Sequence, residues 1–351
     1  MLCACERHSL FCIVPPYVLD SLANSTNATV RKAAIEAIAS AADARATRRV
    51  MQAMPTLAAF AAPAGKKHRL VYDAQHAGLS SLPGKLVRSE GDAAVADVAV
   101  NEAYDNAGTT YDFYKAVFAR NSLDRNGMTL ISSVHLGSRL NNAYWNGQQM
   151  AYGDGDGQAF SRFTKSLDVV GHELSHGVIS HECNLDYRDE SGALNEHFAD
   201  VFGTLVKQWK KKQTTAKADW LVGADILGPG VTSARALRDF GPNKAFENDP
   251  LLGTDRQPKH MRDKYTGTDD YGGVHINSGI PNHAFYRFAR QLGGRAWEVP
   301  GAIWYGAMRQ LSSNSQFADM VNVTTMIAVN RHGTGSAVHN ALKTAWKDVG
   351  L

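Results

Sequence analysis

The most informative segment of this chain is LDVVGHELSHGV, residues 167–178. His172 and His176 lie four residues apart, so a helix would present both imidazoles on one face, as two ligands of a tetrahedral zinc require. Glu173 lies beside the first histidine, where its carboxylate can reach a water near the metal. A helix with two ordinary histidines also fits this segment, because motifs of this length have real false-positive rates. The choice between the two interpretations depends on the rest of the chain.

A second segment, SGALNEHFADVFGTL at 191–205, supplies a third ligand. Ser191 suits an N-cap and an apolar stripe follows it, which predicts a second buried helix. Glu196 and Asp200 lie one turn apart, and two acids on a face meant for the core are costly unless they meet a cation or a donor. Zinc would explain both: Glu196 completes a set of two histidines and one glutamate, and Asp200 accepts the free ring N–H of a ligand histidine. The alternative is a solvated helix face, and His197, off this face, is expected to be structural.

These residues predict metal-assisted hydrolysis. Three protein ligands leave one zinc position open for water, and Glu173 can take a proton as the oxygen attacks a carbonyl. The developing oxyanion needs further donors, for which Tyr187 and His275 are candidates, with Asp270 placed to orient His275. Spacing alone also allows Tyr187 and His275 to be ordinary core or surface residues. Asn195, next to the third ligand, is expected to support the ligand set.

The composition is that of a globular protein with a sizeable core. The 351 residues allow two or three domains, and 44% hydrophobic with 20% charged residues exclude intrinsic disorder and fibrous repeats. The 37 basic and 34 acidic residues give a formal charge of +3, too even to suggest nucleic acid or a membrane surface as partner. No apolar stretch is long enough for a membrane span, and the first residues lack a signal for the general export route.

The chain divides into three predicted parts. Residues 1–60 are expected to form a small helical unit, followed by a linker that extends to about residue 67. Residues 68–186 mix strands and helices and include the HELSH helix, whereas residues 187–351 are expected to be mainly helical, and the last hundred almost purely so. The expected elements are helices at 28–38, 97–120, 283–292 and 302–311, and strands at 70–72 and 128–135.

Five segments match, in order, the pattern of a known family. They are NNAYWNG (141–147), YGDGDG (152–157), HELSH (172–176), GALNE (192–196) and GGVHINSGIPNHAF (272–285). With these segments the chain resembles the thermolysin family of zinc metallopeptidases, and within it the short-propeptide branch typified by protealysin.

The resemblance implies an α+β, two-lobed fold, with a β-rich N-terminal lobe, a mainly α-helical C-terminal lobe and the HELSH helix at the floor of the cleft between them. A small helical propeptide would precede both lobes. It implies that one zinc ion is held by His172, His176 and Glu196, with Glu173 as the general base. The remaining implied roles are oxyanion stabilisation by Tyr187 and His275, orientation of His275 by Asp270, and binding of the substrate backbone by Asn142, Ala143 and Arg238.

The resemblance also implies an apolar pocket for the side chain that follows the cleaved bond. Such a pocket selects Leu, Phe, Ile or Val by burial, at about 1.5 to 3 kcal/mol for a full side chain. We therefore expect cleavage on the N-terminal side of large apolar residues. Any one of the lining residues can equally be a plain core residue. The implied lining consists of Phe160, Phe163, Val169, Val222 and Leu237.

The chain departs from the family pattern at the paired calcium site. Asp168 and Asp219 remain, but three positions where the family has further acids carry none. A buried ammonium group cannot share a site with a divalent cation, so we predict no calcium pair and expect a lysine to neutralise Asp168 instead. The GDGDG run at 153–157 lacks the acidic ladder of a calcium loop and is expected to be a turn. The three positions without an acid are Lys207, Leu221 and Ala224.

The N-terminal segment resembles the short propeptide of the same branch, whose Pro-Pro-Tyr box matches PPYVL at 15–19. We predict that residues 1–60 cover the cleft and are removed by self-cleavage in the linker, before Leu57 or Phe60. Cys3, Cys5 and Cys12 crowd into this segment, whereas Cys183 lies alone. Unpaired thiols are the first interpretation of the crowded cysteines, and a thiolate switch on the zinc or a metal clip that includes His8 is the alternative.

The leading hypothesis is therefore a zinc endopeptidase that acts on peptides and proteins, carries its own propeptide as a partner, and is a monomer. A catalytically silent relative that binds peptides is a rival, which the intact ligand set and Glu173 oppose. An exopeptidase is another, but no acidic cluster for a free amino terminus is evident near the site. For location, we expect synthesis in the cytoplasm with a non-standard route to the periplasm or exterior left open.

Overall fold

A six-stranded sheet organises the N-terminal lobe of the computed structural model, which describes residues 11–51 and 65–351. The three central strands, β6, β4 and β2, run parallel, and the other neighbours are antiparallel. The strands expected at 70–72 and 128–135 are confirmed as β2 and β4. In spatial order the strands are β1 (Phe11–Cys12), β5 (Ala143–Trp145), β6 (Met150–Tyr152), β4 (Leu130–Val134), β2 (Arg69–Asp73) and β3 (Lys85–Ser89).

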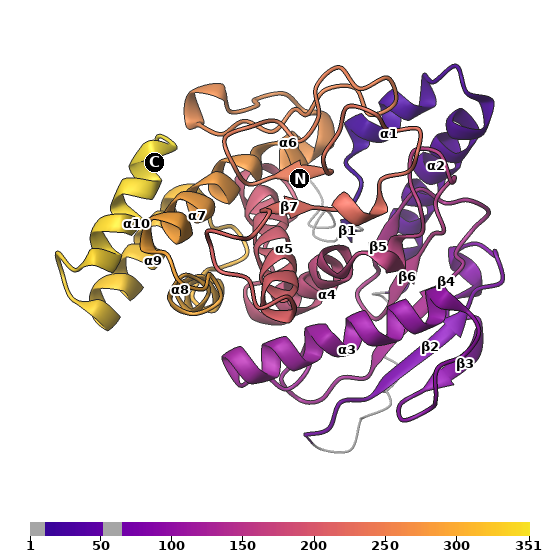
Figure 1. The fold of residues 1–351 in the computed structure, drawn as a ribbon, viewed down its shortest axis with the longest axis horizontal. Helices are drawn as coiled ribbons and strands as arrows, with labels where there is room; N and C mark the ends of the chain where they lie inside the picture. Colours follow the sequence, from indigo (N-terminus) through magenta and orange to yellow (C-terminus); the bar gives the residue numbers. More distant parts are fainter. Residues whose placement is uncertain (1–10, 52–64) are drawn as a thin grey trace.

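Helix α3 (Val98–Phe118) runs along the sheet (Figure 1) and confirms the helix expected at 97–120. Its N-terminus is capped by Asp97, whose carboxylate accepts hydrogen bonds from the backbone N–H groups of Ala99 and Val100. The helix buries alanine, valine and aromatic side chains on one face. This apolar face closes the core of the N-terminal lobe.

Two long helices, α4 (Leu167–Glu182) and α5 (Asp189–Lys210), pack against each other between the lobes. Glycine permits their close approach, because a Cβ atom on Gly203 would lie 2.5 Å from the carbonyl oxygen of Asp168. The expectation that Ser191 caps the second helix is wrong. The helix begins two residues earlier, at Asp189, and the Ser191 hydroxyl donates instead to the carbonyl of Ser315.

The C-terminal lobe is helical, apart from a short hairpin and loops that lie next to it (Figure 1). The helix expected at 283–292 is confirmed as part of α7, and the one expected at 302–311 overlaps α8, which begins earlier and ends at Met308. None of the helices in the described ranges is long and apolar enough to cross a membrane. The remaining elements are α6 (Asp269–Asn277), α7 (Gly279–Leu292), α8 (Val299–Met308), α9 (Phe317–His332), α10 (Ala337–Asp348), β7 (Leu221–Val222), β8 (Arg238–Asp239), and the 3-10 turns Leu79–Ser81, Phe163–Lys165, Ala224–Ile226 and Met261–Asp263.

The N-terminal segment forms a helical hairpin against the two lobes, in indigo in Figure 1. It comprises α1 (Pro16–Ala23) and α2 (Ala28–Met51). Pro16 occupies the first turn of α1, where its missing N–H costs no hydrogen bond. The helix expected at 28–38 is confirmed but is longer than expected. The α+β fold expected from the sequence, with a mixed-sheet lobe, a helical lobe and a helical N-terminal segment, is therefore present.

Candidate active site

The HELSH histidines and Glu196 meet where α4 and α5 pack together. His172 Nε2 lies 3.1 Å from His176 Nε2, and the carboxylate oxygens of Glu196 lie 3.5 Å from each of these nitrogens. Ligand atoms around a tetrahedral zinc lie about 3.3 Å apart, given bond lengths of about 2.0 to 2.1 Å. All three side chains are buried. The donor atoms are therefore arranged as a metal ion of this kind requires.

The far side of each imidazole is held by a polar partner. Asp200 Oδ1 lies 2.9 Å from His172 Nδ1, and Asn195 Oδ1 lies 2.9 Å from His176 Nδ1. These partners fix the rings so that both Nε2 atoms face Glu196. Burial, with the neighbouring His172 charge, lowers the pKa of His176 well below its usual range and favours the neutral ligand form. Glu196 Oε2 is buried without a hydrogen bond within the described residues, as a ligand oxygen would be.

Glu173 is fully buried beside this cluster. Its Oε2 accepts a hydrogen bond from the backbone N–H of Trp145 at 3.0 Å, and its Oε1 has no hydrogen-bond partner in the described part of the chain. Burial raises the pKa of Glu173 well above its usual range, and the nearby Cys12 and Glu196 raise it further. A carboxylate whose pKa is raised in this way accepts a proton more readily than an exposed one.

Tyr187, His275 and Asp270 form a hydrogen-bonded chain on the other side of the cluster. The Tyr187 hydroxyl donates to Glu196 and lies 3.2 Å from His275 Nε2. His275 Nδ1 lies 2.7 Å from Asp270 Oδ1. Burial alone would lower the pKa of His275, but the carboxylates of Glu196 and Asp270 outweigh it and raise that pKa well above the usual range. The side chain therefore carries a positive charge that can face a developing oxyanion.

Residues 11–14 of the N-terminal segment contact this site, with 11–12 as a strand and 13–14 in a bend. Strand β1 pairs antiparallel with β5, the strand that begins at Ala143. The Arg238 guanidinium donates to the carbonyl of Ile13 at 2.9 Å, and Asn142 Oδ1 accepts from the backbone N–H of Val14 at 3.2 Å. His275 Nε2 lies 3.0 Å from the carbonyl oxygen of Cys12. Two of the three residues expected to hold a substrate backbone, Asn142 and Arg238, thus contact this segment, and the third, Ala143, begins the strand that pairs with it.

The five residues expected to line an apolar pocket are all fully buried. The Val222 and Leu237 positions adjoin Arg238, because β7 pairs with β8 and the Leu237 N–H bonds to the Val222 carbonyl. Phe160 and Phe163 lie together, with ring centroids 5.6 Å apart. Val169 faces the core from the first turns of α4. This placement agrees both with a pocket lining and with the plain core that the sequence left open.

A buried ion pair lies near the start of α4. Lys207 Nζ lies 2.8 Å from Asp168 Oδ2 and 2.9 Å from Asp219 Oδ1. Burial alone would raise the pKa of Asp168, but the Lys207 ammonium group outweighs it and holds that pKa below its usual value. The expected neutralisation of Asp168 by Lys207 is therefore confirmed.

Two further sequence-based expectations are also confirmed. His197 is structural: its Nδ1 lies 2.7 Å from Asn282 Oδ1, and its Nε2 accepts from the Trp304 indole. The GDGDG run is a loop that turns at its end, where Asp156 Oδ1 accepts hydrogen bonds from the backbone N–H groups of residues 158, 159 and 160. Cys12 and Cys183 are free thiols. The expectations for Cys3, Cys5, His8, Leu57 and Phe60 fall outside the described residues.

Two residues of the site were not found from the sequence. Trp145 binds Glu173 through its backbone N–H, which no side-chain pattern reveals. Asn282 donates from Nδ2 to Asp200 Oδ2 at 2.9 Å while it also contacts His197. Asn282 lies within the segment 272–285 and could have been found by asking what satisfies the second oxygen of a buried Asp200.

A buried set of two imidazoles and one carboxylate, with an unpaired glutamate oxygen beside it, defines the class of metal-dependent hydrolases. Comparison with known proteins gives the family. A model of the thermolysin metallopeptidase catalytic domain matches residues 56–180, and one of the thermolysin metallopeptidase alpha-helical domain matches residues 183–351. The chain belongs to the thermolysin family of metallopeptidases and is a metalloendopeptidase.

Three relatives illustrate the match. An extracellular metalloprotease of Pectobacterium carotovorum subsp. carotovorum is 46% identical over 291 residues, which are 82% of each chain. A thermolysin of Alicyclobacillus acidocaldarius is 40% identical over 77% of this chain and 49% of its own length. The solved precursor of protealysin, a metalloproteinase from Serratia proteamaculans, superposes with a TM-score of 0.87 at 43% identity, over 97% of this chain and 99% of that one.

Proposed function

We propose that this metalloendopeptidase binds one catalytic zinc ion through His172, His176 and Glu196, cuts before large apolar residues, and is made as a self-processing zymogen. The observation that carries the proposal is the meeting of the three donor groups, with nitrogen–oxygen and nitrogen–nitrogen separations of 3.1 to 3.5 Å. When bound, zinc supplies Lewis-acid activation of the water and of the substrate carbonyl.

Each protein group has a distinct part in the proposed reaction. Glu173 takes the proton of the attacking water and later delivers it to the leaving amine, a task suited to a carboxyl group whose pKa is raised by burial. His275 and Tyr187 donate hydrogen bonds to the oxyanion, and Asp270 keeps His275 charged and oriented. Asp200 and Asn195 hold the ligand histidines in their productive orientation.

The N-terminal segment supports both the substrate-binding roles and the zymogen. Its backbone adds a strand to the edge of the sheet, as an extended peptide would. Arg238 and Asn142 hold consecutive residues of it, and the Cys12 carbonyl points to His275 as a scissile carbonyl would. We infer that the segment occupies the substrate position and that the mature enzyme uses the same contacts, with Ala143 at the start of the pairing strand, for its substrates.

The proposed specificity follows from the residue held at this position. Ile13 is fully buried at the point where its carbonyl meets Arg238, so a branched apolar side chain is accommodated there. An uncharged site prefers such side chains by their burial free energy, at about 1.5 to 3 kcal/mol. We propose that Phe160, Phe163, Val169, Val222 and Leu237 provide the surrounding surface.

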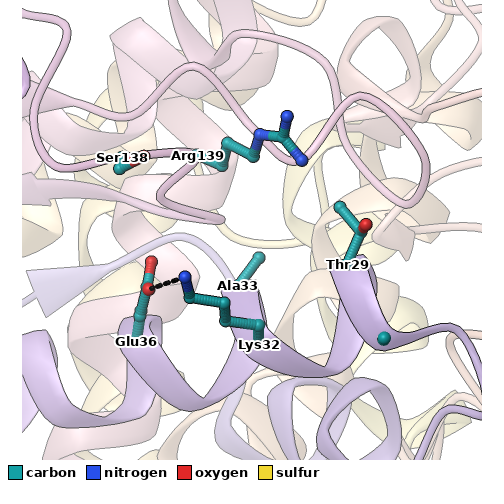
Figure 2. A pocket seen from close by; sticks show the side chains of 7 residues that line it. Thr29, Lys32, Ala33, Glu36, Ser138 and Arg139 are labelled. Carbon is teal, nitrogen blue, oxygen red and sulfur yellow. Dashed lines mark ion pairs between the residues drawn. The ribbon is translucent and has the colours of Figure 1, made fainter.

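The seam between α2 and the N-terminal lobe supports removal of the segment. Figure 2 shows a pocket there in which Lys32 and Glu36 of α2 face Ser138 and Arg139. These polar and charged side chains interrupt the apolar packing at this part of the seam, which favours release once the chain is cut. The proposed cleavage before Leu57 or Phe60 would separate the segment from the lobes.

We further propose that the chain holds no calcium pair beside Asp168. Lys207 already places an ammonium group between Asp168 and Asp219, where a divalent cation would be repelled. The name of the Pectobacterium relative gives an extracellular protein, and we propose that this chain also acts outside the cytoplasm.

The test is digestion of casein by the purified chain, its Glu173→Ala variant and a Glu298→Ala control, each with and without a zinc chelator. Glu298 is exposed on the C-terminal lobe, so its loss leaves the site intact. We expect internal cleavage before Leu, Phe, Ile and Val, which the chelator abolishes and Glu173→Ala reduces by about 10²- to 10⁴-fold. Sequencing the new N-terminus of the mature chain, which the Glu173→Ala form should not produce, tests self-processing. Terminal trimming alone, or equal activity of Glu173→Ala, would contradict the proposal.

A further inference from the structure

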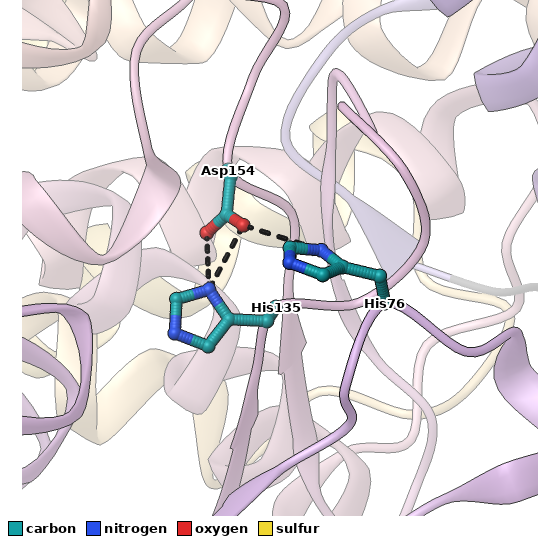
Figure 3. A group of neighbouring side chains, drawn as sticks. All are labelled: His76, His135 and Asp154. Carbon is teal, nitrogen blue, oxygen red and sulfur yellow. Dashed lines mark hydrogen bonds and ion pairs between the residues drawn. The ribbon is translucent and has the colours of Figure 1, made fainter. Parts of the chain in front are cut away.

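A second cluster of histidine and carboxylate groups lies on the N-terminal lobe, away from the catalytic helices. It consists of His76, His135 and Asp154, shown in Figure 3. The three residues follow the carboxyl ends of β2, β4 and β6, which are adjacent parallel strands. Parallel strands end at a common edge of a sheet, which brings side chains from distant parts of the sequence together.

The donor atoms of the cluster converge on Asp154. Its Oδ2 lies 2.8 Å from His135 Nδ1 and 3.7 Å from His76 Nδ1, which donates a hydrogen bond to the Gly137 carbonyl at 3.1 Å. Figure 3 shows the carboxylate between the two rings. The separation expected for ligands of one tetrahedral ion, about 3.3 Å, lies between these values. Small movements of two partly exposed side chains would therefore suffice to place a metal ion among them.

Asp97 supports His135 as a carboxylate supports a metal-ligating imidazole. Its Oδ2 lies 2.8 Å from His135 Nε2, while its Oδ1 caps helix α3. An imidazole that donates Nε2–H to a carboxylate has its Nδ1 directed at the metal and made more basic. The helix cap fixes Asp97 itself, so the orientation of the ring is determined by the fold.

The backbone of both histidines is also unusual. His76 has φ +61° and His135 has φ +55°, values that are uncommon outside glycine. The two residues are joined by a hydrogen bond from the His76 N–H to the His135 carbonyl at 2.9 Å. This left-handed pair turns both imidazoles toward Asp154, and residues in such conformations concentrate at functional sites.

We propose that His76, His135 and Asp154 form a second metal site, for a divalent ion of the zinc, copper and nickel class. Two imidazoles and one carboxylate are the donors that these ions prefer, whereas calcium and magnesium prefer oxygen ligands alone. The ion replaces the proton shared between His135 Nδ1 and Asp154, and the His76 Nδ1 proton that faces the Gly137 carbonyl moves to the other ring nitrogen, Nε2. Solvent completes the coordination, because 60% of the His76 side chain is exposed. The site is independent of the catalytic centre.

The test uses the full, untagged chain in a Glu173→Ala background, so that it is not cut during the measurement. Zinc content is measured after equilibrium dialysis against chelator-buffered zinc, in this chain and in its His76→Asn and His332→Asn variants. Asparagine tolerates the left-handed conformation of residue 76. His332 is an exposed histidine outside the cluster and provides the matched control.

We expect about two zinc ions per chain in the parent and in His332→Asn, and about one in His76→Asn. Asp97→Asn, which preserves the helix cap, should lower the affinity for the second ion by about 10- to 100-fold. Copper added to the chain that already holds its first zinc should give a magnetic resonance spectrum with coupling to imidazole nitrogens, lost in His76→Asn. One zinc per chain in every form, or a second ion that persists in His76→Asn, would overturn the proposal.

Discussion

The two clusters of this chain use the same donor types in opposite surroundings. The catalytic cluster joins His172, His176 and Glu196 across two packed helices, with exposed fractions of at most 1%. The cluster at the strand ends joins His76, His135 and Asp154, of which His76 is 60% exposed. Each has an imidazole supported by an aspartate, Asp200 in the first and Asp97 in the second. The comparison shows that the donor types determine which metal ions a cluster prefers. Burial determines how firmly the cluster retains its ion and whether the chemistry proceeds without bulk water.

Burial also determines how costly it is for each cluster to lose its ion. The second cluster can exchange the ion for a proton, since solvent and Asp97 already stabilise a charged His135. Loss of the catalytic ion would leave two imidazoles and a carboxylate buried against one another, with Glu196 Oε2 lacking a hydrogen bond within the described residues, which is costly. The two sites should therefore differ in how readily they release metal.

The largest expected effect concerns removal of metal from the mature enzyme after saturation with zinc. A chelator added in steps should remove the ion of the exposed cluster first and leave peptidase activity nearly constant. Loss of the buried ion should then lower kcat/KM by about 10³-fold or more, since it removes several kcal/mol of transition-state stabilisation. Metal content and peptide hydrolysis are measured on the same samples.

The control for this experiment is His76→Asn, in which the first phase of metal loss should vanish while the second keeps its rate. The comparison between the clusters fails if activity declines in step with the first ion released. It also fails if both ions leave in a single phase in the parent enzyme.

The catalytic cluster could be found from the sequence and the second cluster could not, for a physical reason. His172 and His176 are one helical turn apart, so their spacing alone reveals a shared face, and the apolar stripe around Glu196 reveals burial. His76, His135 and Asp154 come together only through the parallel order of three strands, which no local pattern encodes.

The same limit applies within the catalytic site. Lys207 could be paired with Asp168 from the sequence, because the family pattern has an acid at the position that this lysine occupies. The N-terminus of α5 could not be placed at Asp189, because Ser191 suits a cap by composition but is engaged by the Ser315 carbonyl of a distant loop. Local propensity predicted that a helix is present, whereas a tertiary contact determined where its N-terminus lies.

Lys207→Met is expected to have the largest effect on stability. It leaves Asp168 buried without its cation, which should lower the free energy of unfolding by about 3 to 5 kcal/mol. Denaturant unfolding in the Glu173→Ala background measures it without self-digestion. Lys210→Met, at an exposed position of the same helix, should change stability by less than about 0.5 kcal/mol.

A double variant, Asp168→Leu with Lys207→Met, sharpens the result. Replacing both charges with apolar side chains should recover most of the lost stability, because no buried charge remains. If the double variant is as unstable as Lys207→Met, shape rather than charge holds the two helices together at this point.

Gly203→Ala is expected to have a smaller effect on stability. It should also change metal binding at the catalytic cluster but not at the second cluster. The new methyl group would meet the Asp168 carbonyl at 2.5 Å and push α4 from α5, lowering the free energy of unfolding by about 1 to 3 kcal/mol. Zinc affinity at His172, His176 and Glu196 should fall as well. Gly78→Ala, where a Cβ meets nothing within 4 Å, is the control. Unchanged zinc affinity in Gly203→Ala would show that the helix spacing does not determine the metal geometry.

The smallest expected effect is the pH dependence of the Lys207 variant. In the parent chain the pKa of Asp168 is held below its unfolded value of about 3.9, chiefly because Lys207 outweighs burial. Its contribution to stability is therefore complete above that pH and is lost as the pH falls through the lower, folded pKa. In Lys207→Met the ammonium group is gone, and burial, the largest influence on Asp168, is opposed only by hydrogen bonds from Ser166 and the Gly223 N–H. We expect burial to raise the pKa of Asp168, so that the folded variant takes up a proton before the unfolded chain does.

A fall in pH should consequently lower the free energy of unfolding of the parent chain and raise that of the variant. The stability difference between them should shrink as the pH falls across this window, by at most about 1.4 kcal/mol per pH unit for each proton involved. Asp219, with 40% of its side chain exposed, is screened by solvent and should add less than Asp168. Unfolding curves of both chains between about pH 3 and 7 measure the difference. A difference that stays constant across this range would mean that Asp168 is not the group that Lys207 stabilises, and the buried charge would have to be assigned elsewhere.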